Sequence, residues 1–162
     1  MNYHPAVEKI KNLLIENEVA FESFEHEAVR TSEEAAKVRT GYSIQQGAKA
    51  LIVRAKITNQ DKRFVMVVVP GDKSFDNQKL KNLLGAKDIR FATETEVGQL
   101  TDGVQPGGVP PFGNLFRLKV YANKSLVNQQ KIIFNAGDKR YSIGMSSQDY
   151  IHVVQPHISD LI

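Results

Sequence analysis

The segment Phe64 to Val69 restricts the fold more than any other part of the chain, because it is a continuous apolar and largely β-branched run. A run without polar alternation predicts a strand that is buried on both faces and lies centrally in a sheet. The run Ala48 to Ile57 is also apolar and β-branched, and Asn59 to Lys62 between the two runs predicts a hairpin turn. Other elements must therefore cover both faces of this strand pair.

Helix signals occur on both sides of the two strands. Pro5 suits a first helical turn, and Thr31 and Thr93 each precede a glutamate by three residues, the pattern of a capping box. After Pro5, apolar residues follow at helical spacing: Val7, Ile10, Leu13 and Leu14. Asp76 can cap a second helix, which carries Leu80, Leu83 and Leu84 and would end at Gly85.

Further strands are expected at residues 19–24, 115–121, 131–134 and 140–145, and Ser147 is expected to cap a last helical turn. The helices and strands mix without a strict βαβ rhythm. This order favours an α+β fold, in which a single domain over residues 1–162 has a mixed β-sheet flanked by short helices.

Composition excludes several classes of protein. A chain of 162 residues with 41% apolar and 24% charged residues can bury a core and is typical of a globular domain. The chain has no cysteine, so disulfides, thiolate zinc sites and cysteine nucleophiles are excluded. No signal-peptide pattern and no apolar run long enough to span a bilayer occur, so we expect a cytoplasmic protein without membrane contact.

Motifs for the common cofactor and nucleophile chemistries are missing. The four histidines are scattered without metal-ligand spacing, and neither a Gly-x-Ser-x-Gly nor a Gly-x-Gly-x-x-Gly motif occurs. We therefore expect no metal and no cofactor. The net charge of +3 permits a polyanionic partner without arguing strongly for one.

The segment Gly103 to Gly113 contains four glycines and three prolines in eleven positions. Glycine lets backbone N–H groups approach a ligand closely, and proline stiffens the chain around them. Such a loop can present donors to a developing oxyanion, but it can equally be a rigid surface turn.

Two further segments each allow two interpretations. Lys49 begins an apolar strand, where it is either a solvated surface residue or a cation at a sheet edge that pairs with a phosphate. Asn135 to Asp138 follows an apolar run, where it is either a turn between two strands or a second glycine wall of a pocket.

Three segments together resemble the YbaK / prolyl-tRNA synthetase-associated editing domain family in order and spacing. They are Gly47 to Val53, Pro106 to Gly113 and Asn135 to Ile143, and the resemblance covers nearly the whole chain. It implies an α+β fold around one pocket. It also implies hydrolysis of the ester that joins a wrong, small amino acid to the terminal ribose of a tRNA, by an aminoacyl-tRNA deacylase that acts in trans.

The resemblance also implies roles for individual residues. Lys49 falls on the family's functional lysine, which would hold the terminal phosphate or adenosine, and the amides of Gly107 and Gly108 would stabilise the oxyanion. The residues that fall on the substrate-binding segments are Pro110, Gly113, Asn135 and Gly137. Asn135 and Ala136 differ from the small residues of some relatives, which leaves the amino acid open among alanine, serine, cysteine and threonine.

The implied partner is the 3′ end of a mischarged tRNA, with a synthetase or an elongation factor as a further candidate. The alternative function is a non-catalytic regulatory module that binds tRNA or a synthetase through the same pocket.

Overall fold

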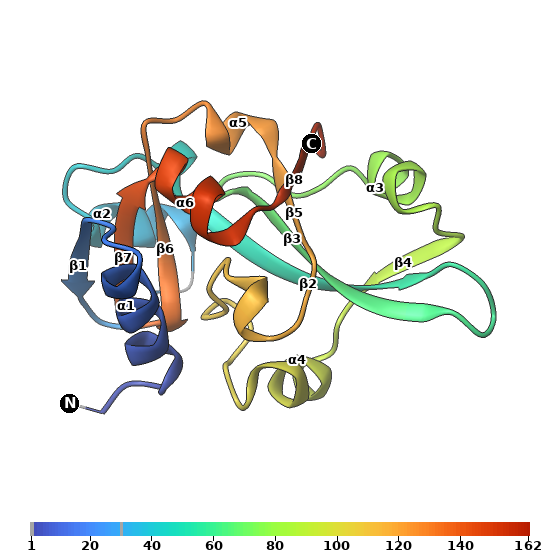
Figure 1. Cartoon of the computed structure of the whole chain (residues 1–162), viewed down its shortest axis with the longest axis horizontal. Coiled ribbons are helices and arrows are strands. Elements are labelled where there is room, and N and C mark those ends of the chain that lie inside the picture. The colour runs from blue at the N-terminus through green and yellow to red at the C-terminus, as the bar shows by residue number, and fades with distance from the viewer. Residues whose placement is uncertain (1, 30) are drawn as a thin grey trace.

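The computed structural model describes residues 2–29 and 31–162, which form an α+β fold (Figure 1). The helices are α1 (Ala6–Glu16), α2 (Ser32–Val38), α3 (Asn77–Leu84), α4 (Glu94–Thr101), α5 (Lys124–Val127) and α6 (Ser147–Val154). The strands are β1 (Phe21–Glu25), β2 (Ala48–Lys56), β3 (Lys62–Pro70), β4 (Asp88–Phe91), β5 (Val120–Asn123), β6 (Lys131–Asp138), β7 (Tyr141–Ser146) and β8 (His157–Ser159). Short 3₁₀ turns lie at Ile44–Gln46 and Gly113–Leu115.

The strands form two sheets rather than one. The five-stranded sheet has the order β4-β2-β3-β5-β8 and is mixed, because β3, β5 and β8 run parallel whereas β2 is antiparallel to both of its neighbours. The three-stranded sheet, in the order β1-β7-β6, is antiparallel. The mixed sheet expected from the sequence is thus present, and a parallel bridge between Gly47 and Ile133 links it to the second sheet.

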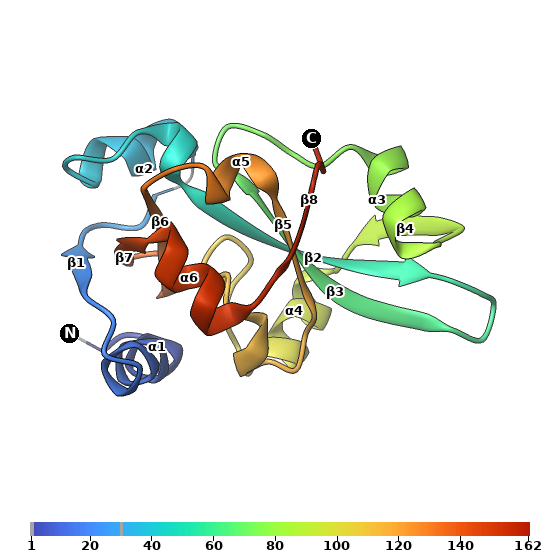
Figure 2. The same ribbon diagram turned by 45° about the horizontal axis from the view of Figure 1, so that its top comes forward.

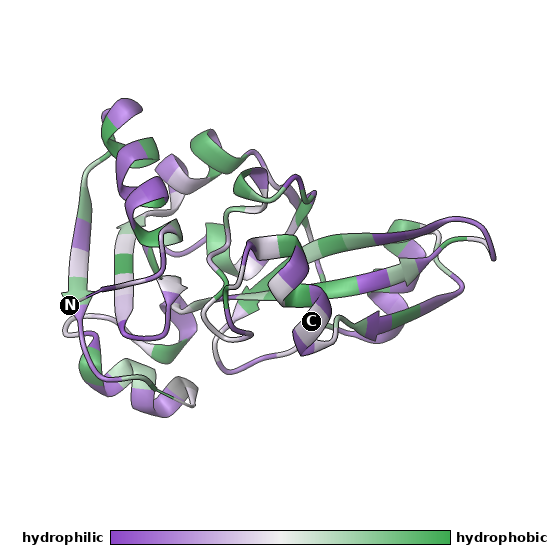
Figure 3. Ribbon diagram, turned by 90° about the horizontal axis from the view of Figure 1, so that it is seen from below, coloured by the Kyte–Doolittle hydropathy of each residue, from purple (hydrophilic) through white to green (hydrophobic). Residues whose placement is uncertain are grey.

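The predicted double-sided burial of β3 is confirmed. Met66 and Val68 point into a core between the two sheets, while Val65, Val67 and Val69 point into a second core against α3. Figures 1 and 2 show α1 and α2 beside the three-stranded sheet and α3 at the far end of the five-stranded sheet. Hydrophobic residues follow the middle of the long strands, and the hairpin end is hydrophilic (Figure 3).

The predicted helix starts are confirmed by their capping hydrogen bonds. The Thr31 hydroxyl accepts the Glu34 N–H, the Asp76 carboxylate accepts the Lys79 N–H, and a reciprocal capping box forms at the start of α4. At the end of α3, Gly85 adopts the left-handed conformation with φ +64°.

Three local expectations differ from the structure, and three short elements were not expected. The strand expected at 115–121 begins only at Val120, because the chain first forms the 3₁₀ turn and then a positive φ of +58° at Arg117. Of the two interpretations of residues 135–138, the turn between two strands is wrong, since β6 continues through this segment by a bulge and the chain reverses after Asp138. Ser146, not Ser147, caps α6. The short elements β4, α5 and β8 have no strong periodicity and were missed.

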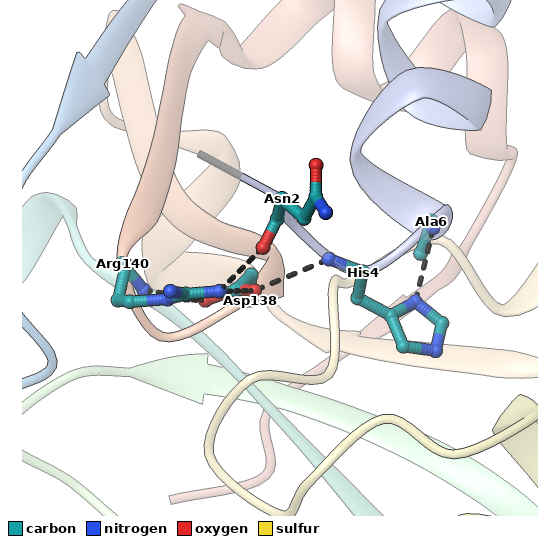
Figure 4. A network of polar contacts seen from close by, with 5 residues as sticks. All are labelled: Asn2, His4, Ala6, Asp138 and Arg140. Carbon is teal, nitrogen blue, oxygen red and sulfur yellow. Dashed lines mark hydrogen bonds and ion pairs between the residues drawn. The ribbon is translucent and has the colours of Figure 1, made fainter.

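A polar network fastens the start of α1 to the reversal between β6 and β7 (Figure 4). Arg140 donates hydrogen bonds from Nε and Nη2 to the Asp138 carboxylate, both at 2.9 Å, and Nη2 also donates to the Asn2 carbonyl. The same carboxylate accepts the His4 N–H at 3.2 Å, and His4 Nδ1 accepts the Ala6 N–H. The Arg140 guanidinium lowers the pKa of Asp138 to about 2.

Across residues 2–29 and 31–162, no helix has the length and apolar character needed to cross a bilayer. Within the same residues, no group of three or more histidine, aspartate or glutamate side chains is placed to hold a metal ion.

Candidate active site

A cleft of about 320 Å³ lies between α2, the first residues of β2, the loop 103–113 and β6. Three of the residues predicted from the sequence line it: Lys49, Gly107 and Asn135. Arg39 and Lys139 are the other charged residues in the described lining, which contains no carboxylate. The cleft therefore combines positive side chains with small apolar ones and suits a ligand that carries negative charge.

Lys49 is the second residue of β2 and pairs with Val69 across the sheet. Burial lowers the pKa of Lys49, and the charge of Asp72 raises it, with burial the larger effect. No carboxylate in the described part of the chain forms an ion pair with Lys49. A half-buried ammonium group in this state gains more from an anionic ligand than a solvated lysine would.

The loop 103–113 places Gly107 at the wall of the cleft. Gly107 has φ +87°, and its carbonyl accepts a hydrogen bond of 2.7 Å from Asn135 Nδ2. Within residues 2–29 and 31–162 the Gly107 N–H meets no acceptor, so this amide remains available to a ligand. The Lys139 side chain packs against the loop, with Cε 3.3 Å from the place of a Gly107 Cβ.

Both backbone groups of the adjacent Gly108 form hydrogen bonds within the protein. Its N–H donates to the Gln105 carbonyl at 2.9 Å, and its carbonyl accepts the Gly137 N–H at 2.9 Å. Gly108 and Gly137 line a second hollow behind the loop rather than the cleft. The amide of Gly108 can therefore reach an oxyanion only if its bond to Gln105 breaks.

The remaining predicted residues also lie outside the lining of the cleft. A Cβ on Gly113 would lie 2.4 Å from the Leu118 carbonyl oxygen, and one on Gly137 would lie 2.5 Å from Ala6 Cβ. Pro110 is buried. These three residues hold the loop and β6 against the core, so their contribution to substrate binding would be indirect.

Sequence reasoning missed Arg39, at the C-terminal end of α2. The residue is 8% exposed, and burial lowers the pKa of its guanidinium to about 10. It donates from Nε to Ser142 Oγ at 3.0 Å and from Nη2 to Asn135 Oδ1 at 2.9 Å. In the sequence, nothing distinguishes it from a solvated arginine near a helix end.

The chain is similar to known proteins over most of its length. The profile of the aminoacyl-tRNA editing domain matches residues 26–153. The multifunctional Ser/Thr-tRNA deacylase ProXp-y of Escherichia coli K12 is 32% identical over 147 residues, which covers 90% of this chain and 86% of that protein. A proline–tRNA ligase of Bacillus subtilis is 36% identical over 100 residues, but the match covers 17% of its length.

The fold also matches a crystal structure of a protein proposed to be a trans-editing enzyme for prolyl-tRNA synthetase. The TM-score is 0.81 at 24% identity, and the match covers 99% of this chain and 98% of that one. The chain belongs to the aminoacyl-tRNA editing domain family. This confirms the family and the enzyme class predicted from the sequence, an aminoacyl-tRNA hydrolase that acts on tRNA.

Proposed function

We propose that this protein acts in trans on tRNA mischarged with a small amino acid and hydrolyses the ester at the 3′-terminal ribose. The observation that carries the proposal is the cleft itself. The cleft brings Lys49 and the available Gly107 amide together beside small apolar residues. Its described lining contains no carboxylate. Hydrolysis of an aminoacyl ester needs little more than a polarised carbonyl and a positioned water, and neither requires a nucleophilic side chain.

In this proposal the Gly107 amide donates to the ester oxygen as negative charge develops there. One donor of this kind is typically worth ~10²–10³ in rate. Lys49 holds the terminal phosphate or adenosine, which keeps the ester beside the loop. The free hydroxyl of the terminal ribose orients the attacking water, so the substrate contributes to its own hydrolysis.

The walls of the cleft would set the amino acid specificity. Ala35, Ala48 and Val109 are among the lining residues, and a cleft of about 320 Å³ that also receives a ribose leaves room for a small side chain. Steric selection of this kind gives ~1–3 kcal/mol per methylene. The name of the Escherichia coli relative adds support for serine and threonine esters, ahead of alanine and cysteine esters.

The test is a deacylation assay with tRNAs charged with alanine, serine, cysteine, threonine and, as a bulky control, leucine. We expect hydrolysis of at least one small ester and none of the leucine ester. Binding of these tRNAs without hydrolysis would instead favour the non-catalytic module. A parallel assay with added synthetase or elongation factor tests whether either protein assists.

A further inference from the structure

Arg39 is a buried cation without a carboxylate partner among residues 2–29 and 31–162. Burying an unpaired charge is costly, and a hydrophobic residue of similar volume would often be cheaper. The guanidinium is instead held by two neutral oxygens, Ser142 Oγ at 3.0 Å and Asn135 Oδ1 at 2.9 Å. A planar guanidinium can bond both partners at once, which the single ammonium group of a lysine does less well.

These contacts fix the orientation of the Asn135 side chain. A guanidinium only donates hydrogen bonds, so the oxygen of the Asn135 amide must face Arg39. The amide nitrogen then faces the opposite way, where Nδ2 donates to the Gly107 carbonyl at 2.7 Å. Both ends of the Asn135 amide are thus used inside the protein, and the side chain links Arg39 to the wall of the cleft.

The other partner of Arg39 is fixed as well. His26 Nδ1 lies 2.8 Å from the Glu27 carbonyl, which can only accept, so Nδ1 carries the proton in a neutral ring. His26 Nε2 then accepts the hydroxyl proton of Ser142 at 2.7 Å, a shorter contact than the 3.3 Å between Ser142 Oγ and Asn135 Oδ1. The lone pairs of the Ser142 oxygen remain directed at Arg39, so the guanidinium is held from two sides.

We propose that Arg39 is a positioning residue, which acts through Asn135 to hold the Gly107 carbonyl and thereby orients the available Gly107 amide toward the ester. The proposal rests on the proposed function of this cleft. Gly107 has no Cβ to restrain rotation about its backbone bonds. Its φ of +87° is one of many backbone conformations that a glycine can adopt. Anchoring its carbonyl fixes the 107–108 peptide group. This limits the rotations about the α-carbon that would reorient the preceding peptide group, which carries the Gly107 N–H.

The kinetic test compares Arg39→Met, Arg39→Lys, Asn135→Ala and the double variant Arg39→Met/Asn135→Ala. Lys37→Met on the exposed face of the same helix is the matched control. We expect Arg39→Met and Asn135→Ala each to lower the single-turnover rate at least tenfold while tRNA affinity changes less than threefold. Arg39→Lys keeps the charge and the stem, and we expect it to fold but not to restore the rate.

The double variant distinguishes positioning from a direct effect of charge. If Arg39 acts through Asn135, the double variant loses no more rate than the worse single variant, within twofold. If the losses of rate in the two single variants multiply in the double variant, the charge of Arg39 acts on the substrate directly and the proposal is overturned. An Arg39→Lys variant that keeps the wild-type rate would have the same meaning.

A second measurement needs no substrate. The ¹⁵N–¹H signals of Gly107 and Gly108 should shift in Arg39→Met and in Asn135→Ala, and stay in place in Lys37→Met. If the wild-type protein hydrolyses none of the tRNAs, the proposed function fails while these shifts still test the linkage. If the protein is active and the Gly107 signal is unmoved in Arg39→Met, the positioning role fails alone.

Discussion

The cleft presents the backbone of the loop 103–113 and three positively charged side chains. Its cations come from three separate elements, Arg39 from the end of α2, Lys49 from β2 and Lys139 from the reversal after β6. Burial lowers the pKa of both Arg39 and Lys49, so each is a cation that gains from a negative partner.

Lys49→Ala should lower the rate of deacylation about 10- to 100-fold, because a hydrogen bond to a charged group is typically worth roughly 1.5–3 kcal/mol. The melting temperature should change little, since Lys49 forms no ion pair among the described residues. Single-turnover assays and thermal unfolding measure both quantities. Lys73→Ala, at an exposed position just after β3, is the control. A wild-type rate of Lys49→Ala at saturating tRNA would show that Lys49 has no role in the reaction.

Gly107→Ala should lower the rate more than it lowers tRNA affinity, and it should cost about 1–2 kcal/mol of stability because an alanine at φ +87° is strained. Lys139, the nearest neighbour of the new methyl group, is flexible and can move aside. Gly108→Ala is the matched variant: its φ is not positive, and the new Cβ would meet the Gln105 carbonyl oxygen at 3.3 Å. We expect a smaller loss there, and equal losses would argue against a specific role for the Gly107 amide.

At the scale of elements, close backbone approach decides where α1 lies. Gly137 sits in the bulge of β6 with φ +105°, and a Cβ at this position would lie 2.5 Å from Ala6 Cβ in the first turn of α1. The network of Asp138, Arg140 and His4 fastens the same turn (Figure 4). The bulge therefore serves the docking of α1, and its Gly137 amide also holds the loop through Gly108.

Gly137→Ala should destabilise the protein by about 2–4 kcal/mol, because a methyl group 2.5 Å from Ala6 Cβ forces α1 to move and the positive φ adds strain. Gly98→Ala is the opposite case, since nothing lies within 4 Å of its Cβ and it is inside α4. We expect that variant to gain about 0.5–1 kcal/mol from helix propensity. Urea unfolding measures both, and a neutral Gly137→Ala would mean that α1 is loosely held.

At the scale of the whole molecule, two sheets from distant parts of the chain enclose one core. Phe112 from the loop packs on Phe134 of β6 and on Tyr150 of α6, so the loop, the second sheet and the last long helix are packed together. The Tyr150 hydroxyl donates to the Pro111 carbonyl at 2.7 Å. The rigidity of the cleft wall is thus a property of the assembled core and not of the loop alone.

Stability should fall as the pH drops from about 4 toward about 2. The pKa of Asp138 is about 2 in the folded protein, below the ~3.9 of an unfolded chain, so the folded state favours the carboxylate. This stabilisation is fully present above the unfolded pKa and is lost as the pH falls through the folded pKa. Glu96, whose pKa is lowered to about 2 by Arg90, acts in the same direction.

Unfolding followed between pH 2 and pH 7 measures this loss. Asp138→Asn should be less stable at pH 7 and should show a shallower dependence on pH, whereas Asp88→Asn on the exposed edge strand should keep the slope of the wild type. An unchanged slope in Asp138→Asn would show that the ion pair with Arg140 does not form in solution.

Local chemistry in the sequence determined much of this protein. The apolar run of β3 required burial on both faces, and the capping residues Thr31, Asp76 and Thr93 set helix starts through bonds that span only three residues. The three segments that resemble the editing family are also local, and they led to Lys49 and Gly107. Such features can be predicted because their physical cause lies within a few residues of chain.

Only the tertiary structure decided how the strands divide into sheets and which residues line the cleft. It divided the strands into two sheets, turned the expected turn at 135–138 into a bulged strand, and placed Gly108, Pro110, Gly113 and Gly137 behind the cleft. It also buried Arg39 against Ser142 and Asn135, which are 103 and 96 residues away in the chain. A buried and a solvated arginine have the same local sequence signals, because desolvation and distant hydrogen bonds arise only when the chain is folded.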